Sequence, residues 1–104
     1  MIIYEVEIQV DRAIREEYES WLMDHIRKIL SLPYFIKPDC LEQVDGQSGS
    51  LTYVVRYASP SIDNLNLYLT DHAPAFRAEA EQRFAGQFKA RRRVLELKNT
   101  FGGE

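Results

Sequence analysis

The two histidines of the chain are its first candidates for chemistry, because imidazole is the side chain whose charge changes nearest neutral pH. His25 follows the only tryptophan, Trp21, by four residues, so both rings lie on one face of any helix that contains them. His72 stands just before Pro74. A partly desolvated imidazole in a cleft could act on a small molecule as an acid, a base or a hydrogen-bonding group. Simple packing in the core is the alternative, and it stays open for both histidines.

Phenolic and guanidinium groups extend this set. Tyr4 and Tyr68 could present hydroxyl groups to a ligand, although tyrosine is first of all a good sheet and core residue. Arg56 could meet an anionic ligand or another subunit, but a structural ion pair with Glu5 or Glu7 is the interpretation we favour. No catalytic residue is assigned. The candidate ligand-binding residues are Trp21, His25, Tyr68, His72, Tyr4 and Arg56.

Several familiar catalytic motifs are missing from the sequence. It contains no nucleophile elbow, no phosphate-binding glycine loop and no zinc-binding HExxH helix. Cys40 has no second cysteine for a disulfide and no neighbouring histidine for a metal site. We therefore expect neither a metal nor a cofactor.

The amino-acid composition limits which classes of protein are consistent with this chain. A chain of 104 residues with 45% hydrophobic and 28% charged residues is typical of one folded domain. A net charge of −3 weighs against binding to nucleic-acid phosphates or anionic lipid. The lone cysteine, a start that does not resemble a signal peptide, and the lack of a long apolar stretch predict a cytoplasmic protein.

The elements that must position the candidate residues begin with a strand at residues 2–10, where apolar and polar residues alternate. A helix follows over residues 11–32, with Asp11 as its expected N-cap and Pro33 as its limit. Its apolar stripe is predicted to face the sheet. The stripe consists of Ile14, Tyr18, Trp21, Leu22, His25, Ile29 and Leu32.

The second half of the chain predicts a hairpin, a broken helix and a last strand. Residues 34–44 form an edge strand, because Pro38 cannot donate to a central ladder, and the turn at residues 45–50 joins them to a central strand at residues 51–58. A helix over residues 62–84, capped by Ser59 or Ser61, should break near residues 71–73 because of Pro74, and Gly86 should end it. Residues 88–98 form the last strand, and residues 99–104 form a frayed tail.

The resulting β-α-β-β-α-β order predicts an α+β, ferredoxin-like sandwich as a single domain over residues 1–98. The antiparallel sheet should have the strand order 4-1-3-2, with the helices on one face. The last strand then lies beside the first. Arg91 and Arg93 are therefore expected opposite Glu5 and Glu7 as cross-strand pairs.

With this order, the chain resembles the dimeric α/β-barrel group of ferredoxin-like proteins, which includes the antibiotic-biosynthesis monooxygenases and EthD-like proteins. The similar segments are the turn at residues 32–35, the histidine-bearing helix at residues 68–76 and a strand that starts the chain. It is most similar to a short bacterial family of unknown function with a His72-Ala73-Pro74 step and an Arg92-Arg93 pair. The resemblance implies a homodimer with facing sheets and a small-molecule cavity in each subunit.

Haem chemistry is not expected from this resemblance. Haem-degrading members of the group have an asparagine on the first strand and a tryptophan and a histidine in the second half. Here the first strand offers Glu5, Glu7 and Gln9, and the tryptophan is Trp21.

Three functional hypotheses follow. The first is a small-molecule-binding homodimer with an aromatic pocket between helices and sheet, which could work as a cofactor-independent oxygenase or an isomerase. The second is a dimeric binding or assembly module without chemistry, since this fold hosts many functions. The third and least favoured is an RNA-binding module, because residues 51–58 lack the signature of RNA-recognition motifs and the pI is acidic.

Overall fold

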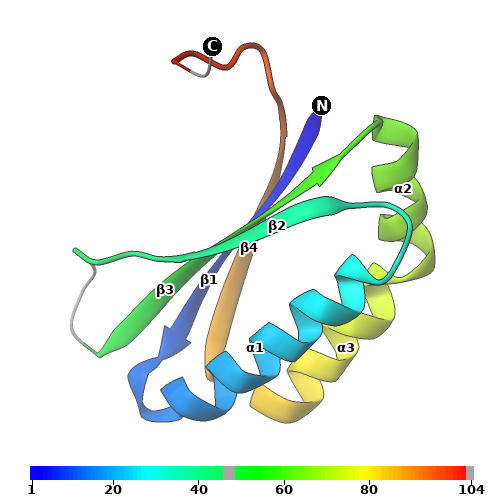
Figure 1. Ribbon diagram of the computed structural model, residues 1–104. Helices are drawn as coiled ribbons and strands as arrows, with labels where there is room; N and C mark the ends of the chain where they lie inside the picture. The colour runs from blue at the N-terminus through cyan, green and yellow to red at the C-terminus, as the bar shows by residue number, and fades with distance from the viewer. Residues whose placement is uncertain (46–48, 103–104) are drawn as a thin grey trace.

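The computed structural model describes residues 1–45 and 49–102, and its elements follow the predicted order (Figure 1). A short 3-10 turn, η1 (Arg12–Ile14), stands between the first strand and the first helix. The other elements are β1 (Ile2–Asp11), α1 (Arg15–Leu30), β2 (Ile36–Glu42), β3 (Ser50–Ser59), α2 (Ile62–Asp71), α3 (Ala73–Phe84) and β4 (Phe88–Glu96). The predicted turn between β2 and β3 falls partly on residues 46–48, outside the described residues.

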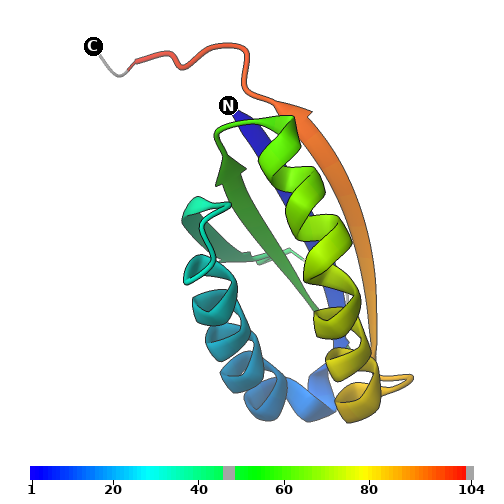
Figure 2. The same ribbon diagram turned by 90° about the vertical axis from the view of Figure 1, so that its right-hand side faces the viewer.

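One antiparallel sheet with the order β2-β3-β1-β4 forms the first layer. The helices α1, α2 and α3 form the second layer, and all lie on the same face of the sheet (Figure 2). This confirms the predicted ferredoxin-like α+β sandwich and its strand order. Within residues 1–45 and 49–102, no helix is long and apolar enough to cross a membrane.

The edge strand β2 bends where the sequence predicts an irregularity. Its pairing with β3 shifts between Ile36 and Asp39, on either side of Pro38, and Lys37 has a φ of 47°. A residue without an amide donor is accommodated here because the outer edge of β2 needs no ladder hydrogen bond.

The start of the first helix differs from the prediction. Asp11 makes no side-chain capping hydrogen bond, and its backbone remains in the sheet, paired with Ser50 and donating to the Gln87 carbonyl at 3.0 Å. The residue is held as the last position of β1, and η1 then turns the chain into α1. Packing therefore fixes this helix, whose buried residues are Tyr18, Trp21, Leu22, Ile26 and Ile29.

The second predicted helix is divided as expected. α2 ends at Asp71, His72 leaves the helical region with φ −125° and ψ −41°, and Pro74 lies in the first turn of α3. The Ser61 side chain accepts a hydrogen bond from the Asn64 amide at 3.1 Å, which confirms it as the N-cap of α2. Gly86, with φ 77°, follows the end of α3.

The core between the layers is unusually rich in rings. Tyr4, Phe35, Tyr57 and Tyr68 contact one another at one end, with centroid distances from 4.9 to 6.3 Å. A second group around Tyr18 fills the other end, near Trp21, Phe84 and Phe88. Residues 97–102 form no helix or strand, so the last strand ends two residues before the predicted limit at residue 98, and residues 103–104 lie outside the described part.

Candidate functional site

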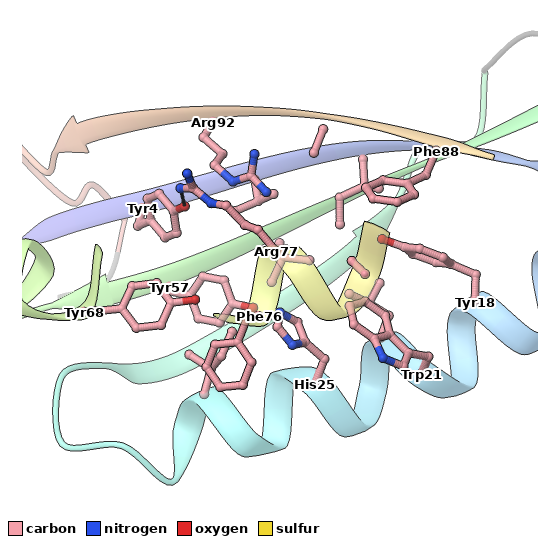
Figure 3. Close-up of a pocket in the computed structure, with 17 residues that line it drawn as sticks. Tyr4, Tyr18, Trp21, His25, Tyr57, Tyr68, Phe76, Arg77, Phe88 and Arg92 are labelled. Carbon is pink, nitrogen blue, oxygen red and sulfur yellow. Dashed lines mark hydrogen bonds between the residues drawn. The ribbon is translucent and has the colours of Figure 1, made fainter. Parts of the chain in front are cut away.

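A cavity lies between α1, α3 and the β1–β4 side of the sheet (Figure 3). The volume that the centre of a water molecule can occupy in it is about 60 Å³. Space of this size holds a few water molecules. Its wall is mostly aromatic and aliphatic, and its polar groups come from Tyr4, Tyr18, His25, Tyr57, Tyr68, Arg77 and Arg92.

Trp21 and His25 form one wall, as their spacing predicts. Their rings are stacked, with centroids 4.7 Å apart and planes 11° apart. The ring of Phe76, from α3, meets the imidazole edge-on at 5.0 Å. The indole Nε1 donates to the Glu79 carboxylate at 3.1 Å, and Lys28 lies 3.7 Å from the same carboxylate oxygen. The hydrogen bond to Glu79 of α3 therefore fixes the orientation of the indole.

His25 is neutral in this environment. Burial lowers the pKa of its imidazole from 6.5 to about 4, although the nearby Glu79 carboxylate acts in the opposite direction. Its Nδ1 is buried and has no hydrogen-bond partner among the described residues. That nitrogen is therefore available to a bound molecule.

Tyrosine hydroxyl groups supply the polar part of the opposite end. The hydroxyl of Tyr4 accepts a hydrogen bond from Nη2 of Arg77 at 3.3 Å. Burial raises the pKa of Tyr68 to about 12, and it raises the pKa of Tyr57 as well. These two phenols are protonated at neutral pH and can serve as hydrogen-bond donors.

Two of the predicted site residues lie elsewhere. His72 packs against Tyr34 and Tyr68 at the junction of α2 and α3, and it does not line the cavity. Arg56 lies on the outer face of the sheet, where its Nε donates to Glu5 at 2.9 Å, and Arg93 binds the other oxygen of the same carboxylate. The favoured ion pair of Arg56 is thus confirmed, and so are the cross-strand pairs of Arg91 and Arg93.

Arg77 and Arg92 line the cavity but were not among the predicted site residues. The sequence contains a signal for each. Arg77 falls at helical spacing between Ala73 and Ala80, which are buried residues of α3. Arg92 alternates with Arg91 and Arg93, so it must face the helices if those two face Glu7 and Glu5.

The described residues include no group of three or more histidine, cysteine, aspartate or glutamate side chains that could hold a metal ion. Cys40 is exposed as a residue, but partial desolvation of its thiol, together with the nearby carboxylates of Glu19 and Glu42, raises its pKa, which disfavours the reactive thiolate. The side chains that line the cavity can take part in ring stacking, hydrogen bonding and proton transfer.

The fold is similar to that of several solved proteins of known activity or name. SnoaB from Streptomyces nogalater, a cofactor-independent oxygenase, is 15% identical over 97% of both chains, with a TM-score of 0.74. MhuD from Mycobacterium tuberculosis, a heme-degrader solved with two hemes in its active site, is 19% identical over 98% of this chain and 100% of that chain, with a TM-score of 0.71. At such identities the likeness shows a shared fold, as the sequence resemblance predicts.

Residues 1–98 match the model of a family described as a domain of unknown function, DUF4286, and the chain belongs to that family. A comparison with curated proteins found no match.

Proposed function

We propose that the protein binds a small, flat aromatic molecule in the cavity between α1, α3 and the sheet. The observation that supports this most is the composition of the wall, in which stacked and edge-on rings surround a few polar tips. Such walls favour planar, partly polar ligands, because rings stack on rings and the polar tips fix the orientation.

The volume of the cavity limits the size of the ligand that it can hold. About 60 Å³ of space for water centres is too little for a large macrocycle, and even a single aromatic ring requires side chains at the mouth to move. Phe76 and Arg77 are on the first turns of α3, directly after the helix break, and are the side chains best placed to do so. We therefore propose a ligand with one or two rings rather than haem.

We further propose that the chain works as a homodimer through the sheet face that no helix covers (Figure 2). An apolar row crosses all four strands on that face, formed by Leu95, Ile3, Ala58 and Ile36 in register. The next row, formed by Arg93, Glu5, Arg56 and Asp39, contains equal numbers of acidic and basic residues. A second copy packed face to face would cover the apolar row without burying excess charge.

Oxidation of the bound molecule by dioxygen is a second candidate function. It is supported by the fold likeness to SnoaB, a cofactor-independent oxygenase, and by the neutral imidazole of His25 in the cavity wall. A bound hydroquinone would pass two electrons and two protons to dioxygen, which gives a quinone and hydrogen peroxide, and the neutral imidazole of His25 could take part as a hydrogen-bond acceptor for the substrate hydroxyl. The test is the rate at which hydrogen peroxide forms from a hydroquinone with and without the protein. Equal rates would rule out this oxidation and leave ligand binding as the proposed function.

The binding proposal is tested through Trp21, because a single tryptophan gives a single indole N–H signal and a single fluorophore. Titration with phenol and with 4-methylphenol should shift that signal and quench the fluorescence. Replacing Ala80 by Leu should weaken both responses about tenfold or more, since the added methylenes fill the cavity.

The matched control is Ala78→Leu, an identical change at an exposed position of the same helix, which should bind like the wild type. Thermal unfolding of both variants separates lost binding from lost folding, and Ala90→Val on β4 is a milder way to fill the same space. No response from the wild type, or an equal response from Ala80→Leu, would leave the assembly module as the remaining hypothesis.

A further inference from the structure

The three consecutive arginines of β4 do not share one environment. Arg91 binds Glu7 with Nη2 at 2.8 Å and Arg93 binds Glu5, both on the outer face of the sheet. Arg92 points to the opposite face, because side chains alternate along a strand, and its backbone position pairs with Val6 of β1. Its side chain therefore lines the cavity between helices and sheet, although the residue as a whole is exposed.

Arg77 reaches the same space from α3. Figure 3 shows its guanidinium group and that of Arg92 extending toward the space beside the Tyr4 hydroxyl. Arg77 donates to that hydroxyl oxygen at 3.3 Å, which leaves the phenolic proton of Tyr4 free to donate to another acceptor. Two guanidinium groups and a phenol thus meet at one end of an aromatic cavity.

Neither arginine has a carboxylate within ion-pair distance in the part of the chain that the structure describes. Both residues are partly open to solvent, so their charges lie at the rim of the cavity and not deep inside it. Two like charges at one end of a cavity repel each other, and an anion between them lowers the electrostatic energy. The positive charge is local, since the whole chain has a net charge of −3. Guanidinium groups bind planar carboxylates in paired hydrogen bonds.

We propose that Arg77 and Arg92, with the hydroxyl of Tyr4, bind the carboxylate of an aromatic carboxylic acid whose ring lies in the cavity. This inference rests on the proposed ligand-binding function and adds the chemical class of the ligand. The small volume favours an acid with one ring, in which the carboxylate is attached directly or through a short linker.

The probes are benzoate and benzamide, which share shape and ring but differ in charge. The indole N–H signal of Trp21 reports binding of each to the intact protein. Wild-type protein should bind benzoate at least about tenfold more tightly than benzamide, because hydrogen bonds to a charged group are the stronger kind. Arg77→Gln and Arg92→Gln should each lower the affinity for benzoate and leave that for benzamide unchanged, and the double variant should bring the ratio near one.

Arg91→Gln is the matched control, because it removes the same charge from the neighbouring position on the opposite face. Its affinities should equal those of the wild type, and thermal unfolding should show that every variant is folded. Equal wild-type affinities for benzoate and benzamide would overturn the anion site and keep the aromatic cavity. Loss of benzoate selectivity in Arg91→Gln would also overturn it, because long-range charge would then explain the preference. Binding of neither probe, nor of the phenols, would count against the proposed function itself.

Discussion

The imidazole of His25 lies between the indole of Trp21 and the ring of Phe76, and its charge has little compensation there. Glu79 is the acidic group that favours the protonated ring, but its carboxylate binds the indole N–H and Lys28. Lys28 and Arg92 are positive neighbours and act against protonation. The side chains around the ring, which come from α1, α3 and β4, therefore keep the imidazole in its neutral form.

The first prediction at this scale is that stability falls with acidification between pH 6.5 and about 4. Over that range the unfolded imidazole binds a proton and the folded one does not, so the loss reaches at most about 3 kcal/mol at 1.36 kcal/mol per pKa unit. His25→Phe should flatten the curve there. Urea unfolding across this range measures the effect, and a slope unchanged by His25→Phe would contradict it.

Glu5 provides an internal check on that experiment. Hydrogen bonds from Arg56 and Arg93 lower the pKa of its carboxyl group from 4.5, so its contribution to stability is present above that value and is lost at lower pH. Loss of stability that survives in His25→Phe and begins only below about pH 4.5 therefore comes from carboxylates such as Glu5 and not from His25.

The residues of the cavity were only partly predictable from the sequence. Trp21 and His25 were placed together because helical spacing fixes their relation within one element. Arg77 and Arg92 were missed because arginine on a helix or strand is normally assigned to solvent, and only the register with β1 shows which face Arg92 occupies. For His72 the sequence leaves both the cavity and simple packing open, and the structure shows packing against Tyr34, where its backbone departs from helical geometry.

At the scale of elements, prolines, glycines and apolar periodicity predicted the order and the boundaries well. Pro38, Pro74 and Gly86 act through their own backbone geometry, so their effect does not depend on distant contacts. Ser61 became a cap because its extended backbone leaves its side chain free to accept from Asn64. Asp11 did not, because pairing between β1 and β3 extends to that residue, a long-range effect that local spacing does not contain.

The second prediction concerns the junction of α2 and α3. The backbone leaves the helical region at His72 and Pro74 has no amide to donate, so the helical hydrogen bonds are interrupted at the junction, whereas they continue through α1. Amide hydrogen exchange should therefore be faster over residues 71–76 than over Arg15–Leu30. An aromatic ligand should slow exchange at the junction, because Tyr68 and Phe76 line the cavity. Equal protection of the two segments without ligand would exclude the junction as the place where the cavity opens.

At the scale of the whole molecule, the two faces of the sheet differ in what covers them. The helices bury one face, including Tyr4, Ile8, Tyr53, Val55 and Tyr57. The other face has no cover in the described part of the chain, and a Glu5 that is only 5% exposed lies on it beneath the arginine side chains of Arg56 and Arg93. That low exposure comes from the two arginines and not from a surrounding core, so the face as a whole remains available to a partner.

The last prediction is that the chain forms a homodimer through this outer face. Ile36 and Ile62 allow a matched comparison, because they are the same residue type with similar exposure, 44% and 47%, on different surfaces. Ile36 ends the apolar row of the sheet, whereas Ile62 begins α2 on the helical layer. Ile36→Asp should weaken dimerisation by about tenfold or more, because it places a carboxylate against apolar surface. In a two-fold interface each subunit contributes one such carboxylate, so the energetic cost occurs twice. Ile62→Asp should leave the dimer intact, since an acidic residue suits a helix N-terminus.

Sedimentation over a range of micromolar concentrations distinguishes the 12.1 kDa monomer from a dimer. A wild-type chain that remains monomeric throughout, or equal weakening by both variants, would show that this face is not the interface.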